Sequence, residues 1–142
     1  MANLFHISEA VTIAMHGMAL IASSEGRLNA VNLSTMTGYS RSHIAKVLGI
    51  LVKTGFLISD RGPSGGFALQ RPASGISLMD VFEAIEGRLL DSPCDLPCKL
   101  CAEKGCLLGG FSARFTKEFS DYLRSRRFSD FQMEFQNSMF IR

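Results

Sequence analysis

The feature that most constrains the fold is a glycine-rich loop between two short apolar runs, placed directly after an amphipathic segment. Residues 56–60 and 67–70 are short, largely apolar runs typical of strands, and small and turn-forming residues separate them. The connecting loop is Arg61-Gly62-Pro63-Ser64-Gly65-Gly66. This pattern predicts a β-hairpin with a tight tip.

Three helices are predicted before this hairpin from the spacing of apolar residues and from helix-capping residues. Ser8 begins the first and Gly26 ends it, with a buried stripe at Val11, Ala14, Met15, Met18 and Ala22. A short helix from Ala30 to Met36 then stops at a turn containing Gly38. Ser40 begins the third helix and Gly55 closes it, with inward positions at Ile44, Val47, Leu48 and Leu51.

Two helices joined by a tight glycine-containing turn and followed by a hairpin are typical of a winged helix-turn-helix. A further helix, from Leu78 to Ile85, is predicted between Ser77 and Gly87. The predicted fold class is therefore mainly α with a small β-hairpin wing. The predicted fold also includes a long C-terminal helix that begins near Gly110.

The basic residues are concentrated in the same part of the chain. The whole protein has a formal net charge of only +2, but residues 27–72 carry six basic side chains against the single acid Asp60. Such a block is where an anionic polymer would bind, although a solvated surface with a few cations is an equally good explanation of charge alone.

The order of the residues in this block favours DNA binding over a merely solvated surface. The first turn of a recognition helix faces base edges in the major groove. Arg41 suits guanine, Lys46 suits a phosphate, and His43 is either a base reader or an ordinary surface histidine. The candidate contacts are Ser40, Arg41, Ser42, His43 and Lys46, together with Arg61 at the wing tip for a minor groove.

All four cysteines lie within thirteen residues, at Cys94, Cys98, Cys101 and Cys106. Nearby prolines and glycines predict an irregular loop on which thiolates can converge. A single zinc ion is usually bound by two pairs of ligands that a longer stretch of chain separates, whereas closely spaced cysteines can surround an iron–sulfur cluster. Free thiols, a Cys98–Cys101 thiol switch and structural zinc are the alternatives to a cluster with two or four irons.

Several function classes are excluded or disfavoured. No apolar run approaches the ~18 residues of a membrane span, and residues 1–9 carry no cleavable signal pattern, so a cytoplasmic protein is expected. No histidine has a nucleophile partner at the spacing of a known motif, which argues against an enzyme.

The wing loop and the run that follows it resemble one family closely. The run from Arg61 to Phe67, followed by Leu69, Ile76–Val81 and Ile85–Gly87, is similar to the winged-helix regulators typified by IscR, NsrR and RirA, the Rrf2 family. The resemblance covers about Ile7 to Cys106. It implies a dimeric transcription factor in which, as in many members, a loop before a long dimerisation helix holds an iron–sulfur cluster.

The cysteine pattern agrees with that family in part. Members have three cysteines with the outer two twelve residues apart, as Cys94 and Cys106 are, but the middle position here is Leu100, between Cys98 and Cys101. In some relatives a carboxylate from the partner subunit, near the start of the first helix, completes the coordination. The matching residue is Glu9, which is also an ordinary acid in a first helical turn.

The C-terminal third predicts a homodimer independently. Seven of the eleven phenylalanines lie beyond Gly110, several of them at helical spacing, and a chain of this size could hardly cover them all. A helix folded back on its own core, or an effector pocket, would account for some of them.

Together these features predict a homodimeric, DNA-binding transcription regulator that senses iron–sulfur status, redox state or nitric oxide. Its parts would be a DNA-binding domain at residues 1–90, a cluster-binding loop at 91–108 and a dimerisation helix with a C-terminal arm at 109–142. The alternatives are a cluster-free thiol redox switch with the same fold and, from another class, a small electron-transfer iron–sulfur protein.

Overall fold

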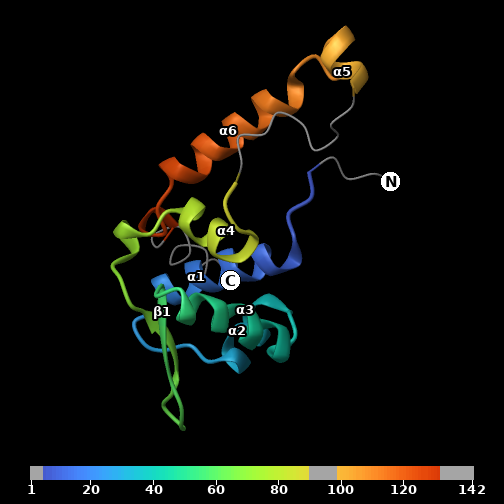
Figure 1. The fold of residues 1–142 in the computed structure, drawn as a ribbon. Helices are drawn as coiled ribbons and strands as arrows, with labels where there is room; N and C mark the ends of the chain where they lie inside the picture. The colour runs from blue at the N-terminus through green and yellow to red at the C-terminus, as the bar shows by residue number, and fades with distance from the viewer. Residues whose placement is uncertain (1–4, 90–98, 132–142) are drawn as a thin grey trace, which may run out of the picture.

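The computed structural model describes residues 5–89 and 99–131, which form a helical body with one projecting hairpin (Figure 1). The first three helices are α1 (Glu9–Ser23), α2 (Ala30–Thr37) and α3 (Arg41–Lys53). α2 is capped by Gly38, whose φ of 84° lies in the left-handed region that glycine tolerates, and α3 begins three residues later, at Arg41. The predicted helix-turn-helix is therefore confirmed.

Serine side chains cap the N-terminal ends of three helices, as the sequence predicts. The Ser8 hydroxyl accepts a hydrogen bond from the Val11 amide at 3.2 Å, and Ser40 begins α3 in the same way. At α4 (Leu78–Glu86) the arrangement is reciprocal, because Ser77 Oγ accepts from the Asp80 amide while the Asp80 carboxylate accepts from the Ser77 amide. These bonds satisfy amides that have no partner inside the helix.

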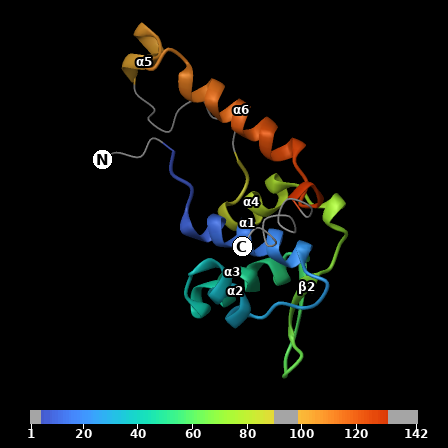
Figure 2. The ribbon, with the colours of Figure 1, turned by 180° about the vertical axis from the view of Figure 1, so that it is seen from behind.

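The hairpin consists of β1 (Leu57–Asp60) and β2 (Gly66–Leu69), paired antiparallel with Leu57 opposite Leu69 and Asp60 opposite Gly66. β2 also pairs with the connection between α1 and α2. Leu28 and Phe67 exchange two backbone hydrogen bonds, of 3.2 and 2.8 Å. The hairpin is thus fixed at its base to the helix-turn-helix and projects beyond it (Figure 2).

Gly66 is required where the hairpin meets the α1–α2 connection. Its φ is 140°, and a Cβ there would lie 2.8 Å from the backbone of Leu28. We expect Gly66→Ala to cost roughly 2 kcal/mol of unfolding free energy, which lowers Tm by about 4–8 °C. Gly49→Ala is the control, because a Cβ at Gly49 meets no atom within 4 Å. Thermal unfolding checks this, and equal Tm values for the two variants would contradict it.

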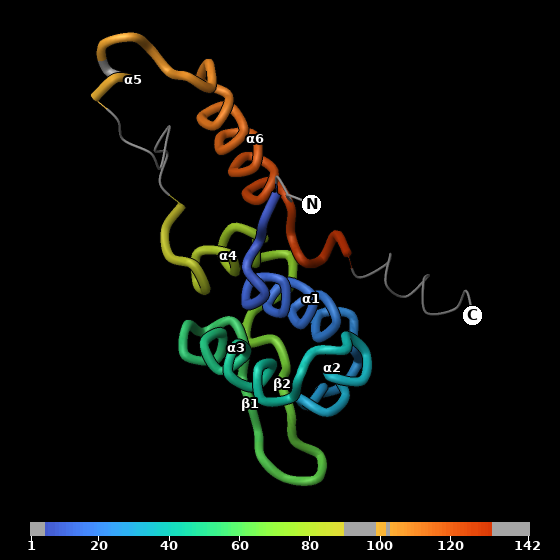
Figure 3. Tube along the Cα trace, turned by 90° about the vertical axis from the view of Figure 1, so that its right-hand side faces the viewer, coloured from blue at the N-terminus to red at the C-terminus, as the bar shows by residue number. Residues whose placement is uncertain are grey.

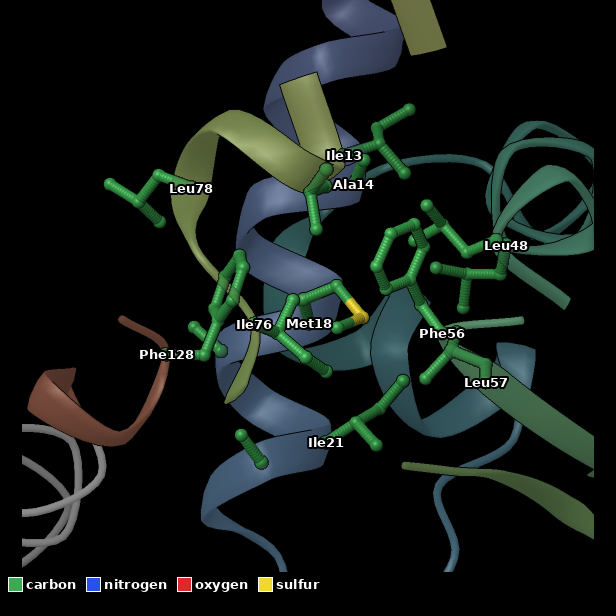
Figure 4. Close-up of a cluster of buried hydrophobic side chains, with 14 of the residues drawn as sticks. Ile13, Ala14, Met18, Ile21, Leu48, Phe56, Leu57, Ile76, Leu78 and Phe128 are labelled. Atoms are coloured by element: carbon green, nitrogen blue, oxygen red, sulfur yellow. The ribbon is translucent and has the colours of Figure 1, made fainter. Parts of the chain in front are cut away.

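One hydrophobic core joins the helix-turn-helix to the C-terminal part of the chain. Met18 of α1 is fully buried, and side chains from α3, β1 and the segment before α4 surround it (Figure 4). Phe128, which follows α6 (Phe111–Ser125), is only 1% exposed in the same cluster. The predicted inward residues of α3 are all buried: Ile44, Val47, Leu48 and Leu51.

The two ends of α6 differ in how they are held. Just past its C-terminal end, the Leu78 amide donates to Arg126 O at 3.1 Å and the Phe128 amide donates to Ile76 O at 3.1 Å. Its N-terminal end follows the short helix α5 (Lys99–Lys104) and extends away from the core (Figures 1 and 3). α6 is thus fixed beside the start of α4 at its C-terminal end and projects at the other end.

Two sequence-based expectations are corrected here. α1 ends at Ser23, three residues before the expected Gly26, because Ser24 is already extended and leads into the pairing of Leu28. The cysteine region is not entirely irregular, since Cys101 lies in α5. In the ranges that the structure covers, no helix combines the length and the apolar character of a membrane span.

Candidate functional site

The first turns of α3 present an exposed polar surface. The side chains of Arg41, Ser42 and Lys46 are exposed, and none of these side chains has a hydrogen bond or ion pair with another residue in 5–89 or 99–131. Ser40 precedes them with an extended backbone and accepts a hydrogen bond from the His43 amide at 3.3 Å. The Ser40 hydroxyl proton stays available for a phosphate oxygen, so the surface can donate along its whole length.

His43 differs from these residues because its ring is already engaged. Nδ1 lies 3.2 Å from Glu9 Oε1, at the N-terminal end of α1. The His43 side chain is 35% exposed and the Glu9 side chain 61%. The structure therefore brings together two residues that the sequence singled out for different reasons, one as a DNA contact and the other as a metal ligand.

The basic block contains paired and unpaired cations. Arg27 forms an ion pair with Asp60 at 2.8 Å, and the guanidinium of Arg71 lies over the Phe56 ring at 4.8 Å. The first pair ties the end of β1 to the α1–α2 connection, and the second joins the residues that flank the two strands of the hairpin. The remaining basic side chains of the block are exposed and have no acidic partner among the described residues: Arg41, Lys46, Lys53 and Arg61.

Arg61 stands at the start of the hairpin tip. The loop closes through a hydrogen bond from the Gly65 amide to Gly62 O at 3.0 Å, and its outer residues are exposed. The hairpin projects on the side of the molecule where α2 and α3 lie (Figures 1 and 3). A cation on a narrow projecting loop beside an exposed helix is the geometry by which a winged helix contacts two grooves of one duplex.

Two of the four cysteines belong to the described part of the chain. Cys101 is half-buried in α5, whereas Cys106 is exposed in the turn before α6. Hydrogen bonds from the backbone N–H groups of Gly110, Leu108 and Gly109 lower the pKa of the Cys106 thiol, while desolvation acts in the opposite direction. Cys94 and Cys98 lie outside the described residues.

The donor set fits a soft metal centre in its chemistry. Thiolate is the form of cysteine that ligates iron, and the amides around Cys106 favour that form. Within 5–89 and 99–131 no three histidine, cysteine or acidic residues lie close enough to hold a metal ion. α5, which contains Cys101, lies beyond the projecting end of α6 and away from α1, the helix that begins with Glu9 (Figure 1).

An apolar cavity of about 510 Å³ lies between α1, α4 and α6. Its size suits a small molecule or the side chains of a packed partner. Six phenylalanine and tyrosine side chains line it, and the Phe119 ring packs edge-to-face with the rings of Phe5 and Phe82. It is lined by Phe5, Ile7, Val11, Met15, His16, Ala19, Leu78, Phe82, Phe119, Tyr122, Leu123, Phe128 and Phe131.

Comparison with known proteins identifies relatives along nearly the whole chain. A model of the Rrf2 family, described as iron-dependent transcriptional regulators, matches residues 7–134. CymR (YrzC), the global cysteine regulator of B. subtilis, superposes with a TM-score of 0.75 at 18% identity, over 92% of this chain and 98% of that one. IscR of T. potens superposes with a TM-score of 0.73 at 17% identity, over 98% and 94% of the two chains.

Proposed function

This chain belongs to the Rrf2 family of transcription regulators, and from that membership we propose that it is a homodimeric operator-binding protein that senses through its cysteine segment. The observation that supports DNA binding most directly is the free first turn of α3, where Arg41, Ser42 and Lys46 are exposed without partners among the described residues. Arg61 on the hairpin adds a second contact. These residues would place the helix in a major groove and the wing in the neighbouring minor groove.

We place the sensing site in the segment between α4 and α6. Cys94, Cys98, Cys101 and Cys106 would hold an iron–sulfur cluster, with Glu9 of the partner subunit as a further oxygen donor. When bound, such a cluster supplies one-electron redox chemistry and reacts with oxidants and nitric oxide. The support is the family match and the backbone amides that lower the pKa of the Cys106 thiol.

The position of this segment gives a physical route from sensing to DNA binding. Residues 94–106 connect α4, which packs in the core, with the projecting end of α6. Thiolates held at one centre would fix the path of this connection, and free thiolates would release it. The orientation of α6, and with it the separation of the two α3 helices of a dimer, would change between these two states.

A second copy of the chain would cover the apolar surface of α6. Phe111, Phe115 and Tyr122 are 61%, 44% and 51% exposed on this helix, and the 510 Å³ cavity opens beside it. Contiguous exposed apolar surface of this kind marks an interface. Residues 1–90, 91–108 and 109–142 would then serve as the DNA-binding, sensing and dimerisation parts.

A cluster-free thiol switch is the second candidate, and the state of Cys106 is the observation that favours it. An exposed cysteine with a lowered pKa is also the residue that an oxidant attacks first. In that case the regulator keeps its fold and its DNA surface, and disulfide formation would replace ligation in ordering the segment. Counting iron, sulfide and free thiols in protein purified without oxygen separates the two candidates.

The salt dependence of DNA binding tests the DNA-binding function. We expect retardation of a random duplex whose log affinity falls steeply with log salt, by about 0.9 per phosphate neutralised. Lys46→Ala should reduce that slope by about 1, because it removes one phosphate contact. Lys117→Ala is the control, since Lys117 lies on α6 and pairs with Asp121 at 2.6 Å. Absence of retardation at low salt would favour the electron-transfer alternative.

A further inference from the structure

The N-terminal ends of α1 and α3 meet at a small polar junction, and the contact between Glu9 and His43 within it has no part in the proposed function. Glu9 is the first residue of α1, and His43 is the third residue of α3. Glu9 Oε1 lies 3.2 Å from His43 Nδ1. The neighbouring Ser8 hydroxyl donates to the Glu86 carboxylate, so it does not compete for Glu9.

His43 is held at two points, its backbone and its ring. Its amide donates to Ser40 Oγ at 3.3 Å while its ring meets Glu9. An ionised carboxylate can only accept, so Nδ1 must carry the proton in this contact. In the tautomer with a single proton on Nδ1, Nε2 is a bare acceptor, and Nε2 has no partner in the described part of the chain.

We propose that Glu9 is a positioning residue that sets the tautomer and the orientation of His43 for base reading, an inference that rests on the proposed DNA-binding function. His43 then presents an Nε2 acceptor beside the exposed Arg41 and Ser42. In a major groove this acceptor suits the exocyclic amino group of cytosine or adenine, whereas Arg41 suits the acceptors of guanine. Glu9 itself makes no DNA contact and acts through the ring.

A substitution series separates positioning from general charge effects. The variants are Glu9→Ala, Glu9→Gln, His43→Ala and the double variant Glu9→Ala/His43→Ala. The probe is a duplex selected by the wild-type protein from a randomised library, with a set of its single-base substitutions. Glu9→Ala and His43→Ala should each weaken binding to the selected duplex by about 3- to 10-fold, as loss of one hydrogen bond does. Both should relax the preference at the same base pair.

The double variant and the conservative variant give the decisive results. Glu9→Ala should cost nothing further once His43 is removed, because the two residues act through one contact. Glu9→Gln should bind like the wild type, since its amide oxygen still accepts from Nδ1–H. Additive losses, or a Glu9→Gln variant that behaves like Glu9→Ala, would overturn the assignment. Glu25→Ala is the charge control, because it removes the same charge beyond the other end of α1.

Nitrogen NMR of the His43 ring tests the inference without DNA. The free wild-type protein should show the Nδ1–H tautomer, and Glu9→Ala should shift it toward Nε2–H while Glu25→Ala leaves it unchanged. A wild-type Nε2–H tautomer refutes the inference even if a variant fails to fold. Failure of the wild type to select any duplex would refute the proposed function instead, so the two failures are distinguishable.

Discussion

Replacing Cys94 and Cys106 together by alanine is expected to abolish the visible absorbance of anaerobically purified protein and its bound iron and sulfide. The reason is that two of the four thiolate donors are lost, including Cys106, whose thiol pKa three backbone amides lower. The same variant should change operator affinity, because residues 94–106 no longer hold α6 in one orientation. Metal analysis, the absorbance spectrum and a mobility shift measure these effects.

Leu107→Ala is the matched control for this change. Leu107 is next to Cys106 and 93% exposed, so its truncation alters the same turn without removing a donor. It should keep the absorbance and the iron content of the wild type. Unchanged operator binding by the double cysteine variant would defeat the proposed coupling. A colourless wild-type protein with four titratable thiols would instead favour the thiol switch.

Removing the Arg41 guanidinium is expected to weaken operator binding by about 10- to 100-fold. A paired hydrogen bond between arginine and guanine contributes roughly 1–3 kcal/mol of discrimination. Arg41 is exposed at the start of α3, and no described residue competes for its guanidinium. Binding to random duplex should fall much less, so that the ratio of specific to nonspecific affinity decreases. Fluorescence anisotropy with both duplexes measures that ratio.

Lys53→Ala provides the comparison for Arg41→Ala. Lys53 is an exposed cation at the opposite end of the same helix, so the variant removes one charge from α3 without touching its first turn. It should weaken both duplexes equally and leave the ratio unchanged. If the two variants had the same effect on the ratio, Arg41 would be a general electrostatic contact and not a base reader.

The fold was predictable where local chemistry determines it. Ser8, Ser40 and Ser77 each accept a hydrogen bond from an amide three residues on, as expected from a capping residue before an apolar stripe. The end of α1 was missed because a distant contact decides it. Leu28 pairs with Phe67, thirty-nine residues later, and the chain must leave the helix early to reach it.

The short helix in the cysteine region shows a different limit. Prolines and glycines at both sides suggested an irregular loop, but residues 99–104 contain neither, and all of them except Cys101 are good helix formers. α5 forms over this stretch and ends at Gly105, whose φ is 88°. The helix propensity of residues 99–104 themselves therefore predicts α5 better than the residues on either side of them do.

The candidate site was predictable residue by residue but not in its contacts. The net charge of residues 27–72 includes Asp60 only as one negative charge among six positive ones. In the structure Asp60 pairs with one particular cation, Arg27. The contact between Glu9 and His43 joins residues thirty-four positions apart and carries no signal in the sequence. Only packing of α1 against α3 brings them within hydrogen-bond distance.

The unequal attachment of α6 makes it a lever. The helix has 15 residues and is roughly 22 Å long, with its pivot beside Ile76 and Phe128. A tilt of about 10° at that pivot moves the cysteine end of α6 by about 4 Å. This displacement is more than a tenth of the roughly 34 Å that separates half-sites on successive turns of a duplex. Side chains at the pivot, remote from both sulfur and DNA, would therefore help to determine which operator spacing the dimer tolerates.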